Sequence, residues 1–80
     1  MKLKDFLSKI TLTGVEICKE YNLIYNVYDE NNAGVGLNID TSMVPNGTKL
    51  TYHTNFTLEN DILTVDGISI NTNDVMMLGM

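Results

Sequence analysis

From Gly14 to Ile70 the chain alternates apolar and polar residues over most of its length, and this period of two limits the fold more than any other feature. The alternation is clearest in residues 35–39 and 50–58. Ile, Val and Thr, which favour strands, supply 22 of the 80 residues, whereas Ala occurs once and Arg and Gln are missing. The sequence therefore predicts a mainly β protein.

The first ten residues follow a different period. Leu3, Phe6, Leu7 and Ile10 are spaced as one apolar stripe of a helix, and Asp5 lies on the opposite side with the lysines. We expect an amphipathic helix over about residues 2–10. Two or three turns are marginal alone, so this helix should pack on one face of the sheet that follows.

Turn residues divide the remainder into about six short strands between residues 14 and 71. Residues 50–58 are expected to form one continuous strand, with Tyr52 and Phe56 on the same face. The tail, residues 72–80, is expected to form either a short helix or an edge strand. The chain is expected to reverse at Asn22, at Asp29–Gly34, at residues 40–47 around Pro45, at Glu59–Asp61 and at Asp66-Gly67.

These elements predict a single α+β domain over residues 1–80, mainly β, because a chain of this length supports only one thin core. The expected architecture is an N-terminal helix packed on a small antiparallel sheet or a partly closed barrel. A two-layer arrangement of helix on sheet is the alternative.

The net charge of −5 is unevenly distributed. Residues 1–20 carry four lysines and three acidic residues, whereas residues 21–80 carry Lys49 and seven acidic residues. A chain without arginine lacks the planar group that reads phosphate and guanine, so we expect no direct binding of nucleic acid. The acidity serves solubility or matches a basic surface on a partner.

No apolar run approaches the length of a membrane span, and Asp5, Ser8 and Lys9 interrupt the start where a signal peptide needs an unbroken apolar stretch. We therefore expect a cytoplasmic protein that does not contact membranes. The single Cys18 agrees with a reducing compartment and is expected to be an inert thiol of the core.

The sequence offers little for catalysis or cofactor binding. Cys18 and His53 are the only thiol and imidazole, and we expect His53 on the polar face of its strand, which gives no nucleophile with a positioned base. Residues 29–34 followed by Asp40 resemble a calcium loop loosely, but Ala33 and Asp40 stand where the pattern needs an oxygen ligand and a glutamate. We predict no enzyme, no metal and no cofactor.

Surface residues are the remaining candidates for function. Tyrosines 21, 25, 28 and 52 suit an interface, and they suit the core and rim of the sheet better still. The apolar tail is either tucked into the core or pressed against a second copy, and we expect a homodimer. The acidic turn residues predicted to bind a basic partner are Asp29, Glu30, Glu59 and Asp61, and the residues predicted for self-association are Met76, Met77 and Leu78.

Three segments resemble short phage or prophage proteins of low-GC bacteria: the opening MKLKDFLSKI, the strand VEICKEYNLIYNV and the pair LTYHTNFTLENDILTV. The resemblance covers the first 28 residues and residues 50–65, its motifs are generic, and GVGLNIDTSMVPNGT has no counterpart. It implies an accessory gene and carries over no site residue.

The combined hypothesis is a non-enzymatic interaction protein of phage or mobile-element origin that docks on a host protein. Its most specific form is an inhibitor of a nucleic-acid-handling defence complex, as anti-CRISPR proteins are, because such complexes carry basic channels. The alternative is a structural protein that assembles into a larger homo-oligomer through strand edges and the tail.

Overall fold

The computed structural model describes residues 1–39 and 46–78. A short helix, α1 (Leu3–Leu7), precedes the strands, and a 3-10 turn, η1 (Lys19–Tyr21), connects the first two. The strands are β1 (Gly14–Cys18), β2 (Leu23–Tyr28), β3 (Gly34–Gly36), β4 (Thr51–His53), β5 (Thr57–Glu59), β6 (Ile62–Val65) and β7 (Ile68–Asn71).

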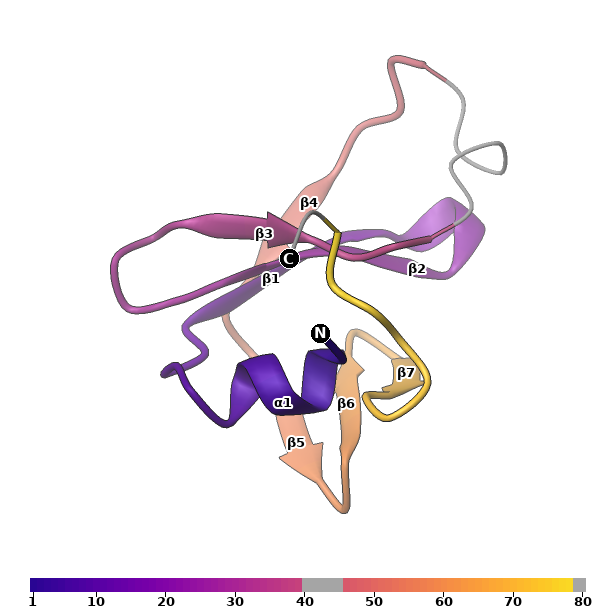
Figure 1. The fold of residues 1–80 in the computed structure, drawn as a ribbon. Helices are drawn as coiled ribbons and strands as arrows, with labels where there is room; N and C mark the ends of the chain where they lie inside the picture. Colours follow the sequence, from indigo (N-terminus) through magenta and orange to yellow (C-terminus); the bar gives the residue numbers. More distant parts are fainter. Residues whose placement is uncertain (40–45, 79–80) are drawn as a thin grey trace.

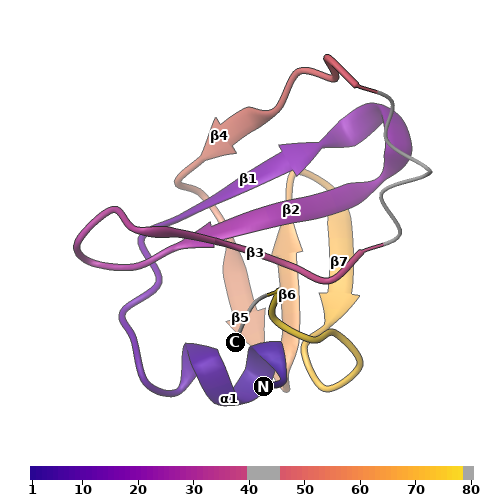
Figure 2. The same ribbon diagram turned by 45° about the horizontal axis from the view of Figure 1, so that its top comes forward.

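The strands form two antiparallel sheets, one in the order β3-β2-β1-β4 and the other in the order β5-β6-β7. Figure 1 shows the four-stranded sheet on one side of the molecule, and α1 with the three-stranded sheet on the other. Strands of the two sheets cross steeply in this view and in the turned view of Figure 2. A mainly β domain is confirmed, but the expected single sheet or partly closed barrel is wrong, since the described strands form two separate sheets.

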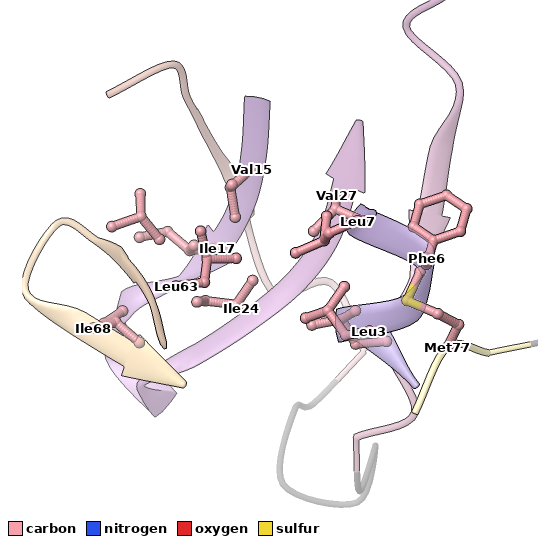
Figure 3. Packing of buried hydrophobic residues seen from close by; sticks show 12 residues of the cluster. Leu3, Phe6, Leu7, Val15, Ile17, Ile24, Val27, Leu63, Ile68 and Met77 are labelled. Atoms are coloured by element: carbon pink, nitrogen blue, oxygen red, sulfur yellow. The ribbon is translucent and has the colours of Figure 1, made fainter. Parts of the chain in front are cut away.

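One hydrophobic core lies between the two sheets and α1. In Figure 3, Ile17 and Ile24 of the larger sheet point toward Leu63 of the smaller one, while Phe6 and Met77 meet at the opposite end of the cluster. Side chains of both sheets, the helix and the tail therefore share one apolar interior. Its buried members are Leu3, Phe6, Leu7, Val15, Ile17, Ile24, Val27, Leu37, Leu63, Val65, Ile68 and Met77.

Helix α1 is shorter than the residues 2–10 predicted from the apolar stripe. It ends at Ser8, whose Oγ donates a hydrogen bond of 2.7 Å to the carbonyl oxygen of Asp5. Hydroxyl side chains that bond to the backbone in this way compete with the helical hydrogen bonds. Its apolar residues Leu3, Phe6 and Leu7 are buried, but the helix stops before Ile10 joins the same stripe.

The predicted continuous strand over residues 50–58 is also wrong, because β4 and β5 belong to different sheets and residues 54–56 lie outside both. A continuous strand would place Tyr52 and Phe56 on one face. In the structure Phe56 packs against the core, whereas Tyr52 is largely exposed on the far side of the four-stranded sheet. The break between the strands makes these two positions compatible.

Most predicted turns are confirmed. Asn60 and Asp61 both have positive φ angles and join β5 to β6 as a two-residue turn, and Asp66 and Gly67 do the same between β6 and β7. Asn22, in the left-handed region, follows η1 at the reversal between β1 and β2. The turn predicted around Pro45 lies outside the described residues.

The tail runs back across the molecule and pairs with the first residues of the chain. Met76 forms an isolated antiparallel bridge with Lys2, and Met77 forms one with Leu37. The backbone N–H groups of Leu3 and Met77 donate hydrogen bonds to the carbonyls of Val75 and Met1, at 2.7 and 2.8 Å. Of the two predicted forms, the described tail thus resembles an added edge strand more than a helix.

Candidate functional site

Three of the four acidic residues predicted to bind a partner use their carboxylates within the fold. Asp29 Oδ1 accepts hydrogen bonds from the backbone N–H groups of Asn31 and Ala33, at 2.9 and 3.0 Å. Glu30 Oε2 accepts one of 2.9 Å from the N–H of Thr11, in the segment between α1 and β1. These contacts stabilise the turn between β2 and β3.

Asp61 joins the helix, the second acidic turn and the tail. Its Oδ2 lies 3.3 Å from Lys4 Nζ and accepts a hydrogen bond of 3.1 Å from Asn73 Nδ2. Its carbonyl oxygen accepts two more, from the N–H and the Oγ1 of Thr72. Glu59, by contrast, is exposed at the end of β5, and the described residues give it no ion pair.

The four acids do not form one cluster. Asp29 and Glu30 lie at the turn that follows β2, and Glu59 and Asp61 lie at the turn between β5 and β6, which Figure 1 places at a different end of the molecule. The four predicted residues therefore lie on two separate turns, and Glu59 is the one whose carboxylate makes no hydrogen bond or ion pair within the described part of the fold.

The residues predicted for self-association are also divided. Met77 is 4% exposed and belongs to the core, so its side chain is not offered to a second copy. Met76 and Leu78 are 44% and 59% exposed. Only these two of the three therefore remain available on the surface.

A more organised surface is the side of the four-stranded sheet that faces away from the core, which we call the outer face. The register of β1 to β4 places Glu16 beside Asn26 and Tyr52, and Gly14 beside Tyr28. Gly34 and Gly36 of β3 continue the same two rows. The opposite side of these strands carries core residues. The outer face therefore carries a carboxylate, an amide and two phenol groups, with glycines as their neighbours in the strands.

Glu16 lies at the centre of the outer face and is half-buried. Its Oε1 accepts hydrogen bonds from Asn26 Nδ2 at 2.6 Å and from Tyr28 Oη at 3.2 Å. Burial raises the pKa of Tyr28, and the neighbouring Glu16 carboxylate raises it further, so the phenol remains a proton donor at neutral pH. The Glu16 side chain is therefore held in one orientation.

The two tyrosine rings of the outer face meet edge to face, with centroids 5.2 Å apart and planes at 85°. The Tyr52 ring covers Gly14, where a Cβ atom would overlap it, and Tyr28 approaches the position of a Cβ on Gly34 to 2.8 Å. The Leu78 side chain lies above Gly36 at the other end. The glycines thus allow the large side chains to lie close to the sheet.

Replacement of Gly14 by alanine is expected to destabilise the protein by about 1–3 kcal/mol, because the new methyl group must displace the Tyr52 ring. Gly36→Ala is the matched control, since a Cβ there meets Asn26 and Leu78 at 3.4 and 3.5 Å, which are ordinary contacts. Urea unfolding of both variants measures the difference. Equal stabilities would contradict the packing of Tyr52 on Gly14.

The structure separates the two residues considered for catalysis. His53 pairs with Val15 at one end of β1, whereas Cys18 lies at the other end, about 10 Å along the strand. Cys18 is fully buried, as predicted, and its Sγ donates to Glu20 Oε2 at 3.5 Å. Burial raises the pKa of this thiol and Glu20 raises it further, which keeps it protonated and weakly nucleophilic.

Glu16 and Asn26 were not among the residues selected from the sequence. The available signal was the presence of Gly14, Gly34 and Gly36 at strand positions, since glycine within a strand often marks the close approach of another group. The prediction named acidic residues in turns, because turns are exposed. Glu16 instead lies between two core residues of one strand.

Within residues 1–39 and 46–78, no three His, Cys, Asp or Glu side chains are grouped so that they could hold a metal ion. The same residues contain no helix with the length and apolar character needed to cross a lipid bilayer. Comparison of the chain with protein-family models, with curated proteins and with solved structures finds no match.

Proposed function

We propose that this protein is a small acidic interaction module without enzymatic activity, which binds a basic surface of a host protein through its outer face. Phage or mobile-element origin and a cytoplasmic location in the bacterial host are part of this proposal. The observation that carries it is the fixed carboxylate of Glu16 beside the Tyr52 ring, which is 47% exposed.

Composition and geometry support the same partner chemistry. Interface centres are enriched in tyrosine, whose ring contributes contact area at a low entropic cost. The chain carries a net charge of −5, which attracts a basic surface and opposes binding to DNA or RNA. An inhibitor that covers the nucleic-acid channel of a defence complex, in the manner of anti-CRISPR proteins, is the specific form of this function that we favour.

The proposal is tested by capture on the immobilised protein from a bacterial host lysate, followed by identification and purification of the retained protein. We expect a dissociation constant that rises with salt and rises at least about tenfold in Tyr52→Ala. Thr57→Ala, on the exposed strand β5 of the other sheet, is the control and should bind normally. A partner that binds Tyr52→Ala as tightly as the unmodified chain would contradict docking through the outer face.

The acidic turns require a separate variant. Charge reversal at Asp29, Glu30 or Asp61 would remove contacts that stabilise the fold. A loss of binding in such a variant could therefore come from unfolding as well as from a lost contact with the partner. Glu59→Lys avoids this problem, because its carboxylate has no ion pair in the described structure. Unchanged affinity in Glu59→Lys would remove Glu59 from the interface.

The second candidate function is assembly into a homo-oligomer larger than a dimer. The exposed Met76 and Leu78 favour it, because they extend the edge of the four-stranded sheet next to β3. Light scattering over a range of concentrations separates the two functions: growth beyond a dimer supports assembly, and a constant mass supports the interaction module.

A further inference from the structure

The Glu16 carboxylate is held in place by hydrogen bonds, but the described residues give it no ion pair with a cation. Oε1 accepts two hydrogen bonds, whereas Oε2 accepts none within residues 1–39 and 46–78. Lys4 and Lys19 pair with Asp61 and Asp66, away from the outer face. A half-buried carboxylate is less screened by water than a fully exposed one, so a cation placed on Oε2 interacts strongly.

The groups around Glu16 select the shape of that cation. Tyr52 lies directly across from Glu16 in the strand register, and its ring is exposed next to the edge-to-face contact with Tyr28. A planar guanidinium donates hydrogen bonds to a carboxylate and stacks on an aromatic ring at the same time, which the compact ammonium of lysine does less well. Leu78 offers apolar contact for neighbouring residues of the same ligand.

We propose that the outer face is a binding site for an arginine side chain of the partner protein, with the guanidinium on Glu16 Oε2 and against the Tyr52 ring. This inference rests on the proposed function and specifies the chemical group that the partner presents. Asn26 and Tyr28 act as positioning residues, because their hydrogen bonds hold Oε1 and leave Oε2 without a hydrogen bond from the described residues. The net negative charge of the chain complements a basic segment around that arginine.

The site is tested by nuclear magnetic resonance titration with three short peptides, acetyl-Gly-Xaa-Gly-amide, in which Xaa is arginine, lysine or citrulline. Citrulline has the shape of arginine without its charge. We expect the arginine peptide to shift the signals of Glu16, Asn26, Tyr28 and Tyr52 with saturation in the millimolar range. The lysine peptide should bind at least about threefold more weakly, and the citrulline peptide should give no saturable shift.

Two variants complete the experiment. Glu16→Gln keeps an oxygen that accepts from Asn26 and Tyr28 but removes the charge, and it should abolish the shifts caused by the arginine peptide. Tyr52→Ala should weaken binding of the arginine peptide about threefold or more. It provides the test of the site if Glu16→Gln fails to fold. Glu59→Gln is the matched control on another strand and should leave the titration unchanged.

Equal shifts with arginine and citrulline, or shifts that persist in both outer-face variants, would overturn the arginine site. So would shifts confined to the acidic turns. The titration uses no partner protein, so its failure removes this site alone. The proposed function instead fails when the captured partner binds Tyr52→Ala as tightly as the unmodified chain, which the peptides do not test.

Discussion

Replacement of Leu63 by alanine is expected to lower the free energy of unfolding by about 2–5 kcal/mol, since a fully buried side chain is lost and a cavity remains. Leu63 is the central residue of the contact between the two sheets, because β6 is the middle strand of its sheet and Leu63 faces Ile17 and Ile24 across the core (Figure 3). Domains of this size have little stability to lose, so this loss is a large share of the total free energy of unfolding.

Leu58→Ala is the matched control, because Leu58 pairs directly with Leu63 in the register of β5 and β6 but is 43% exposed. A hollow of about 220 Å³ lies beside Leu58, and its lining residues are Lys4, Leu7, Ser8, Leu58, Asp61 and Thr72. We expect a loss of about 1 kcal/mol or less. Chemical unfolding at a fixed pH measures both variants, and similar losses would refute the arrangement of the two sheets.

Replacement of Met77 by alanine is expected to cost about 2–4 kcal/mol, because its side chain fills the end of the core beside Phe6. The adjacent Met76→Ala should cost no more than about 0.5 kcal/mol, since that side chain points outward. Both variants keep the backbone hydrogen bonds of the tail, so the difference isolates the buried side chain.

Thermal unfolding provides the measurement for this pair. Each kcal/mol corresponds to a change of about 4–8 °C in Tm for a domain of this size, so the two methionine variants should differ clearly. Indistinguishable melting temperatures would mean that the tail does not dock on the core, and the assignment of Met77 to self-association would then become open again.

The local part of the fold was predictable from the sequence. The turns at Asn60-Asp61 and Asp66-Gly67 need two successive residues with positive φ angles, and both pairs consist of residue types that tolerate such angles. The burial of Leu3, Phe6 and Leu7 follows from their spacing in the same way. Such features depend on neighbours in the chain and on no distant contact.

The division into two sheets was not predictable, because the alternation of residues 50–58 is the same whether the strand continues or breaks. The choice depends on distant groups: Gly14 accepts the Tyr52 ring, and the core accepts Phe56. The outer face was missed for a related reason. Glu16, Asn26 and Tyr28 become neighbours only through the register of β1 and β2, which includes an irregularity after Glu16.

The contacts between residues 1–3 and residues 75–77 have a consequence for synthesis of the protein. Helix α1 leaves the ribosome well before the groups that accept hydrogen bonds from its first turn, the carbonyls of Thr72 and Val75, have been synthesised. The hairpins of β5 to β7, by contrast, pair strands that are joined by short turns, so each can form as soon as its second strand has emerged. The apolar side chains of α1 therefore remain without part of their packing partners until the segment that contains Thr72, Val75 and Met77 has emerged.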